Sequence, residues 1–299
     1  AMTIIETGDN TGVFVGTFLV PDKKGADMEL VYYDSKDAAG SAVEYYDTAT
    51  VVSNSGSVAF DRSVYPVPFT SGDLRTGSAN QSLQTESGAV TAWITVSDAD
   101  ETNDTLTTAA TTAAGTILIK HTNSTGSVTI ATAGSTASYD ATAGLRAAEL
   151  GPLNEIVIGS SEFETSLSIS ETMGYASGTN TIQAGDVIQV EYVDTADDAG
   201  STSTFYDSST FDLRTGTLSV DKDVYVLGSD MVITVTDPDL NLDSGTCESY
   251  AMSLIEWDSS ASSSTLLATS TASNSSTDFT SNPSSLEETG CDTGVFQTV

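Results

Sequence analysis

Apolar and polar residues alternate along much of this chain in short runs, which is the pattern of half-buried β-strands. In one clear run, Ile233 to Thr236, two aliphatic residues alternate with two threonines. The expected strands cover 57–67, 92–104, 115–122, 187–193, 202–206, 217–226, 231–243 and 250–258, with a hairpin that joins 28–33 to 43–46. Short strands separated by frequent turn signals predict an all-β fold, made of tandem immunoglobulin-like β-sandwich domains.

The chain also repeats itself, and the repeats indicate how it is divided. The segment Tyr33 to Ser41 recurs 160 residues later (193 − 33) as Val193 to Ser201. Likewise, Ile94 to Asp100 recurs 139 residues later (233 − 94) as Ile233 to Asp239. An acidic glycine turn is matched at three places, which begin at Glu6, Glu149 and Glu288.

These registers predict three domains. Residues 1–52 match the C-terminal half of an Ig-like domain, 53–212 a complete Ig-like domain with insertions, and 213–299 the N-terminal part of a further one. We therefore expect a fragment of a longer exported chain. Half-sandwiches have open strand edges, so we expect the terminal halves to pair with missing parts of their own domains or with a neighbouring chain.

One strand end concentrates side-chain oxygens. Asp237, Asp239, Asn241 and Asp243 occupy alternate positions, which face the same way in an extended chain. Three carboxylates that close repel each other by several kcal/mol at an effective dielectric of about 20, so a hard divalent cation such as Ca²⁺ is the expected partner. The alternative is a solvated turn in which Asp side chains cap the backbone. An EF-hand is rejected, because Leu242 stands where that loop needs glycine.

The central repeat offers a second, weaker version of this cation site. Its candidate ligands are Asp98, Asp100 and Asp104. The cation, Ca²⁺ or another divalent ion, is expected to have a structural role.

Composition narrows the classes of partner. The 299 residues carry 9 Lys plus Arg against 42 Asp plus Glu, a net charge of −33. Such a chain lacks the basic footprint that nucleic acids and anionic lipids require, and it attracts cations. It also has no apolar run long enough to span a membrane.

The acidic, Ser/Thr-rich composition is typical of an extracellular chain, and in that setting a disulfide and glycosylation are expected. Cys247 and Cys291 are expected to form a disulfide, as in oxidising compartments, and to close a loop of 44 residues (291 − 247). The Asn-x-Ser/Thr pattern predicts glycosylation at one or more of Asn80, Asn103, Asn123 and Asn274.

Signals for catalysis are lacking, so we predict that the chain is not an enzyme. Its only histidine, His121, is interpreted as a surface residue of an edge strand. Pairs of carboxylates suited to glycoside hydrolysis can be chosen almost anywhere among so many acidic residues, so their presence does not indicate an enzyme.

Three recurring features carry a family resemblance. They are the strand from Gly56 to Pro68, the Ile-Thr-Val-x-Asp-x-Asp strand ends that start at Ile94 and Ile233, and the acidic glycine turn from Glu6 to Phe14. Their ordered recurrence over the whole chain resembles the surface-layer (S-layer) proteins of ammonia-oxidising archaea. In the central repeat, the segment from Glu149 to Asn154 departs from the turn pattern, which puts a cation role for that turn in doubt.

The resemblance implies an exported, acidic, glycosylated protein of tandem Ig-like domains. Copies of such a protein assemble with one another into a porous two-dimensional lattice that coats the cell and binds divalent cations. The expected location is therefore the extracellular surface. The alternative function is that of an Ig-like adhesin or stalk protein that forms no lattice.

Overall fold

The computed structural model describes residues 3–20, 25–69, 88–101, 105–106, 117–133, 148–150, 153–171, 181–251, 254–257, 266–267 and 285–298. Its regular elements are strands, joined by a single-turn 3₁₀ helix at Pro238–Leu240. The predicted all-β fold is thereby confirmed. Within the described residues, no helix has the length and apolar character that crossing a bilayer requires.

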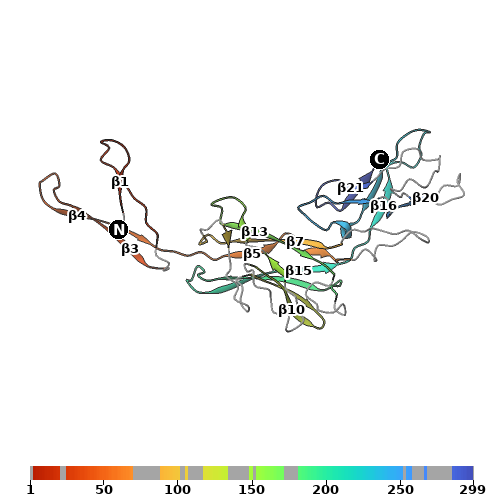
Figure 1. Ribbon diagram of the computed structural model, residues 1–299, viewed down its shortest axis with the longest axis horizontal. Coiled ribbons are helices and arrows are strands. Elements are labelled where there is room, and N and C mark those ends of the chain that lie inside the picture. The colour runs from red at the N-terminus through yellow and green to blue at the C-terminus, as the bar shows by residue number, and fades with distance from the viewer. Residues whose placement is uncertain are drawn as a thin grey trace. The chain divides into compact units, whose positions relative to one another are not determined.

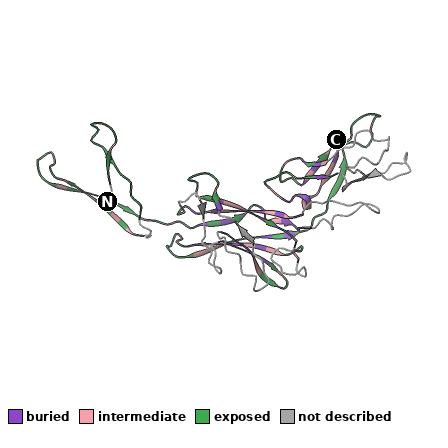
Figure 2. Ribbon diagram, in the orientation of Figure 1, coloured by how far each residue is buried: buried purple, intermediate pink, exposed green. Residues whose placement is uncertain are grey.

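The chain divides into two compact units, residues 1–56 with 194–203 and residues 57–193 with 204–299. In the first unit, β1 (Ile5–Glu6) pairs antiparallel with β2 (Phe14–Val15). A longer hairpin joins β3 (Asp27–Asp34) to β4 (Val43–Thr50), and the two strands pair over their full length. Most side chains of these strands are exposed (Figure 2).

The second unit begins with a central module of two sheets, several strands of which are labelled in Figure 1. The first sheet has the order β5 (Ser57–Phe60), β7 (Val90–Ser97), β13 (Glu162–Ile169), β12 (Leu153–Glu155) and β8 (Thr105–Leu106). The second has the order β11 (Ala148–Leu150), β10 (Gly126–Ala133), β9 (Ile117–Asn123), β14 (Val187–Asp194), β15 (Ser203–Asp212) and β6 (Val64–Pro66). Most pairs are antiparallel, while β10–β11 and β15–β6 are parallel.

Period-two patterning builds the core of the central module. Strands β7 and β14 alternate strictly between buried and half-buried positions, as a sheet with one face in the core requires. The inward residues of both sheets form one hydrophobic cluster, which includes Ile94, Val96, Phe163, Val190 and Tyr192. The cluster is purple in Figure 2.

A C-terminal module, residues 217–298, has one sheet that corresponds to the first sheet of the central module. Its order is β16 (Thr217–Val220), β17 (Ile233–Thr236), β22 (Val295–Thr298), β21 (Ser285–Glu288) and β18 (Ser249–Ala251). A short pair, β19 (Glu256–Trp257) and β20 (Leu266–Leu267), lies outside it. The module has its own smaller core, formed by Ile233, Leu240, Tyr250, Ile255, Leu286 and Phe296.

Candidate functional site

An aspartate–tyrosine clamp recurs in both modules of the second unit. Asp61 follows β5, and its Oδ1 accepts hydrogen bonds from the Trp93 N–H (2.8 Å) and the Tyr65 hydroxyl. The C-terminal copy uses Asp221, Tyr225 and Val232 in the same way. In that copy, the bonds from Tyr225 and Val232 lower the pKa of Asp221 to about 2. The clamp fixes the path of the chain between the first two strands of each sheet.

A turn centred on the carboxylate of Glu288 joins β21 to β22 in the C-terminal module. Glu288 Oε1 accepts the backbone N–H groups of Thr293 (2.7 Å) and Gly294 (2.8 Å). Two left-handed residues, Asp292 (φ 90°) and Gly294 (φ 60°), bend the chain around the carboxylate. The same turn forms at Glu6, which accepts from Gly12 N.

The structure corrects the position of this turn in the central module. We predicted that it begins at Glu149, but that residue lies in β11. Glu155 takes the role instead and accepts the N–H groups of Gly159 (2.8 Å) and Ser161 (2.7 Å). The prediction was wrong because the left-handed glycine of the other copies is replaced by Ser161 (φ 57°), which hides the pattern in the sequence.

The first two residues of the predicted cation loop bond to nearby backbone. Asp237 precedes the 3₁₀ helix and caps it by accepting from Asp239 N (3.0 Å). Asp239 Oδ2 accepts from Arg214 N (2.7 Å), and the Arg214 guanidinium lies 3.6 Å from Asp239 Oδ1. Burial raises the pKa of both carboxyl groups.

The last two residues of the loop point elsewhere. Arg62 donates to the Asn241 carbonyl (2.8 Å) and to Asn241 Oδ1 (2.6 Å), and it also pairs with Asp292 (2.8 Å). Asp243 Oδ1 instead accepts from the indole N–H of Trp93 (2.8 Å). The four predicted ligands therefore do not converge on one point, and arginine side chains lie beside two of them.

As placed, these residues do not fit a closed calcium site. Among the described residues, no group of three or more His, Cys, Asp or Glu side chains is arranged to hold a metal ion. In the central copy, Asp98 accepts from Asp100 N (3.0 Å) and from the Tyr192 hydroxyl (2.5 Å). The remaining predicted ligand, Asp104, lies outside the described residues.

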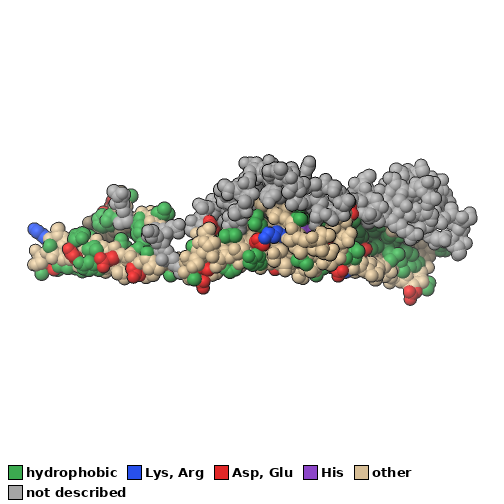
Figure 3. Space-filling model, turned by 90° about the horizontal axis from the view of Figure 1, so that it is seen from below, with side chains coloured by type: hydrophobic (Ala, Val, Ile, Leu, Met, Phe, Trp, Pro, Cys, Tyr) green, Lys and Arg blue, Asp and Glu red, His purple; other side chains and the backbone are tan. Residues whose placement is uncertain are grey.

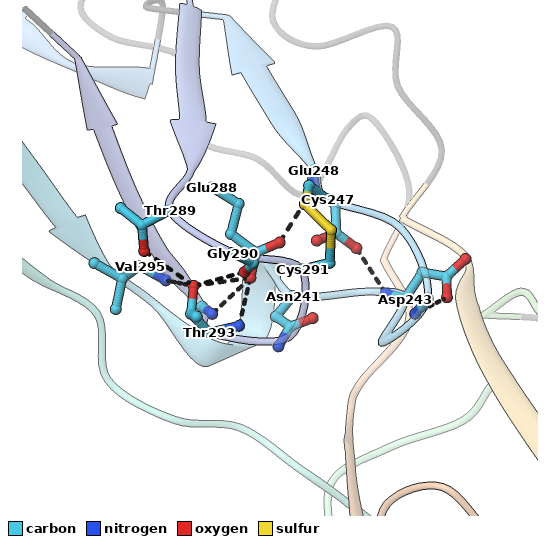
Figure 4. Close-up of a disulfide and its surroundings, with 12 residues drawn as sticks. Asn241, Asp243, Cys247, Glu248, Glu288, Thr289, Gly290, Cys291, Thr293 and Val295 are labelled. Carbon is cyan, nitrogen blue, oxygen red and sulfur yellow. Dashed lines mark hydrogen bonds between the residues drawn. A yellow bond between two sulfur atoms is a disulfide. The ribbon is translucent and has the colours of Figure 1, made fainter.

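A disulfide joins Cys247 to Cys291, and a pair of acids lies beside it (Figure 4). Glu248 Oε1 accepts the N–H groups of Leu242 (2.8 Å) and Asp243 (2.6 Å). Its Oε2 is buried and accepts no hydrogen bond from a described donor. Burial, and then a hydrogen bond shared with Glu288, raise the pKa of Glu248 to about 7.

Glu288 responds in the opposite direction. Burial alone would raise its pKa, but hydrogen bonds from Glu248 and from the turn that follows Glu288 outweigh burial and lower it. As pH falls below about 7, Glu248 therefore takes up a proton while Glu288 stays ionised, and the pair then carries one negative charge between the acidic loop and the turn.

The structure overturns our interpretation of His121 as a surface residue. Its strand, β9, lies between β10 and β14, and its side chain is fully buried. His121 Nε2 lies 2.9 Å from Asp186 Oδ2, and burial lowers the histidine pKa. Its burial was hidden because the lysine and threonine beside it suggest an exposed strand.

Among the predicted sequons, only Asn123 falls in the described residues. It ends β9, and its Oδ1 accepts from the N–H (2.9 Å) and the hydroxyl (2.7 Å) of Thr125. The other three, Asn80, Asn103 and Asn274, lie outside them. Glycosylation at all four stays a prediction.

Comparison with known proteins gives no assignment. No family model matches the chain, and no curated protein matches it.

Proposed function

We propose that this chain is a non-enzymatic structural protein of the surface-layer type, which assembles with copies of itself into a porous, acidic lattice on the cell surface. In this proposal its repeats are immunoglobulin-like domains. The observation that carries the proposal is that equivalent strands recur along the chain with the same local hydrogen bonds. The Asp61 and Asp221 clamps and the three glutamate turns give each repeat the same local frame.

Strands with exposed apolar side chains favour a protein that assembles with others over one that stays monomeric. Large apolar side chains are exposed on β1 to β4 and on β16. Five of them, Phe14, Leu30, Tyr32, Leu218 and Val220, stand at positions where the central module has buried residues. Exposed apolar patches and open strand edges of this kind mark interaction surfaces.

The acidic surface supports a role for cations as counter-ions. On the face drawn in Figure 3, Asp and Glu side chains are spread over the described residues rather than gathered in one cage. A net charge of −33 repels a neighbouring copy of the same charge, and cations screen that repulsion. We therefore propose that divalent cations act at the contacts between copies, with no closed calcium site at Asp237 to Asp243.

Electron microscopy of the purified chain tests the proposal. The protein is concentrated with millimolar CaCl₂, with NaCl at matched ionic strength, and with CaCl₂ plus a chelator. We expect periodic arrays with CaCl₂ that disperse in the chelator. Isolated rods in every condition would favour the adhesin or stalk function instead. Arrays that persist in the chelator would contradict the role of divalent cations but would still support a lattice.

A further inference from the structure

We infer that the acidic loop holds the C-terminal module rigidly on the central module, and that Arg62 supplies the positive charge there in place of the predicted divalent cation. Both modules belong to the second compact unit. The joint consists of residues 241–245 of the acidic loop together with Asp61, Arg62, Thr91 and Trp93 of the central module. All of its contacts lie within one chain, so the inference does not depend on the proposed lattice.

Leu242 carries the acidic loop into the core of the central module. Its side chain is 7% exposed and belongs to the hydrophobic cluster of the central module rather than to that of its own module. Phe69, just after β6, packs against both clusters. Parting the two modules would therefore expose apolar surface to water, which opposes their separation.

The backbone of the same leucine continues the hydrogen bonding along one edge of β7. In an antiparallel ladder, alternate N–H groups of a strand point to the same neighbour. The neighbour here is β5, which pairs with β7 over residues 94–97. Past the end of β5, the Trp93 N–H donates to Asp61 Oδ1 and the Thr91 N–H donates to the Leu242 carbonyl (2.8 Å). The acidic loop thus takes up the edge of β7 where β5 ends.

Arg62 binds two separate segments of the C-terminal module. It donates to the carbonyl and the Oδ1 of Asn241 in the acidic loop, and it pairs with Asp292 in the glutamate turn. Asn241 Nδ2 in turn donates to Asp292 Oδ1 (3.1 Å). The arginine side chain is only 11% exposed, and its planar fork of donors fixes the geometry of its partners. Two oxygen-bearing side chains are thereby bound to a cation that the protein itself provides.

Trp93 contacts the C-terminal end of the same loop. Its indole N–H donates to Asp243 Oδ1, and its ring lies so close to Gly245 that a Cβ at this glycine would be 3.1 Å away. The Ser244 hydroxyl donates to Asp61 Oδ2 (2.5 Å). Apolar, ionic and aromatic contacts thus follow one another along residues 241–245, and a rotation of the C-terminal module would break them together.

The linker between the two modules is fixed by the first half of the acidic loop. It covers residues 213–216, between the end of β15 and the start of β16. Asp239 accepts from the Arg214 N–H, and Gly216 packs so closely on Asp237 that a Cβ there would lie 2.7 Å from Asp237 Oδ2. Of the four residues predicted to bind a cation, two therefore fix the linker and two fix the central module.

Nuclear magnetic resonance relaxation of the full-length, perdeuterated chain tests the joint. The chain is measured in EDTA, at a concentration where it is monomeric. We expect the backbone amides of the central and C-terminal modules to fit a single rotational diffusion tensor. Separate tensors for the two modules would overturn the inference. Separate tensors that merge when calcium is added would overturn it as well, because they would assign the joint to a bound cation instead of Arg62.

Two variants test which residues make the joint. Arg62→Gln removes the charge and the fork of donors, and Leu242→Ala removes the apolar anchor. In each variant the Trp93 indole N–H should exchange with solvent at least about fivefold faster, because opening of the joint frees it from Asp243. The double variant should give the two modules separate diffusion tensors. Native exchange rates in both single variants would contradict the inference, provided that the amide spectrum of each module shows it to be folded.

The matched control is Lys222→Gln, which makes the same change of charge at the repeat position of Arg62 (62 + 160). Lys222 is 56% exposed and contacts no residue of the central module in the printed ion pair, which joins it to Asp221. Indole exchange and tumbling should therefore stay native. An equal acceleration of exchange in Lys222→Gln would show a general effect of charge and would overturn the role of Arg62.

Failure of the joint can be told apart from failure of the proposed function. A rigid joint without periodic arrays would retain this inference and reject the lattice. Periodic arrays from a native chain whose modules tumble separately would do the reverse.

Discussion

The central and C-terminal modules have equivalent sheets but different surfaces. Both have the aspartate clamp, the capping aspartate that ends the second strand, and the glutamate turn. They differ at β5 and β16, which are alternately buried in one module and exposed throughout in the other. Local hydrogen bonds are thus set by local sequence, whereas burial of the same positions depends on a hairpin from elsewhere.

The first unit shows the same contrast from the other side. Phe14 of β2 corresponds to Phe163 and Phe296 in the two modules, and all three follow a glutamate turn. Phe163 and Phe296 are fully buried, whereas Phe14 is 57% exposed. The glutamate turn thus forms whether or not the phenylalanine that follows it is buried. Replacing each of these three phenylalanines by alanine should therefore lower stability by very unequal amounts.

The largest predicted effect is therefore that of Phe163→Ala. Removing a fully buried phenylalanine should lower the free energy of unfolding of its module by about 3–5 kcal/mol. Phe296→Ala should do the same in the C-terminal module, while Phe14→Ala should change it by less than about 0.5 kcal/mol. Chemical denaturation at a concentration where the chain is monomeric measures all three. Equal losses for Phe14→Ala and Phe163→Ala would break the contrast.

The next prediction concerns the covalent link that the central module lacks. Replacing Cys247 and Cys291 by alanine should lower the stability of the C-terminal module by about 4 kcal/mol, because the disulfide closes a loop of 44 residues. Hydrogen exchange should show faster exchange in β21 and β22 and no change in β7 and β13. Reduction of the native chain is the matched control and should give the same pattern. A change spread evenly over both modules would show that they unfold as one.

A smaller effect distinguishes the two aspartate clamps. Tyr65 is fully buried, whereas Tyr225 is partly exposed. Tyr65→Phe removes the bond from a fully buried tyrosine to Asp61, which still accepts from the Trp93 N–H, and should cost about 1 kcal/mol. Tyr225→Phe should cost less than about 0.5 kcal/mol, because water replaces the lost donor. Thermal unfolding of both variants measures the difference, and equal costs would mean that the C-terminal clamp is covered in solution.

The sequence predicted the repeated strands well because they depend on local patterning. The runs around Ile94 and Ile233 form β7 and β17. The 160-residue repeat matches Asp61 with Asp221, and the 139-residue repeat matches their backbone donors, Trp93 and Val232. The central glutamate turn was misplaced because Ser161 adopts a conformation that sequence rules reserve for glycine.

The acidic loop could not be predicted from side-chain types alone. Alternation suggested that four oxygens converge, but the 3₁₀ helix at Pro238–Leu240 breaks the extended geometry that this assumes. Asn241 then meets Arg62, which lies 179 residues earlier, and Asp243 meets Trp93, 150 residues earlier. The residues around Asn241 and Asp243 do not indicate that their partners lie so far away in the sequence.

The smallest predicted effect depends on pH and on the acid pair beside the disulfide. Glu248 has a pKa of about 7 in the folded chain and 4.5 as its ordinary value, so between these values the folded state binds more protons than the unfolded state. The stability of the C-terminal module should therefore fall as pH rises from about 4.5 to about 7, and this contribution should stay constant above that range. The lowered pKa of Glu288 acts only at more acidic pH, below its ordinary value of 4.5.

Glu248→Gln tests this dependence, because an amide imitates the protonated acid. Its oxygen can still accept from Leu242 and Asp243, while its NH₂ group can donate to Glu288. At pH 8 the variant should melt about 2 °C above the native chain, a modest shift because the pair is partly exposed and screened. At pH 5 the two should melt together. At the glutamate turn of the central module, Glu155 accepts from the backbone N–H groups of Gly159 and Ser161, and no second carboxyl group of the described residues bonds to it. Glu155→Gln should therefore show no gain at pH 8. A native chain whose C-terminal module gained stability between pH 5 and pH 8 would contradict the raised pKa of Glu248.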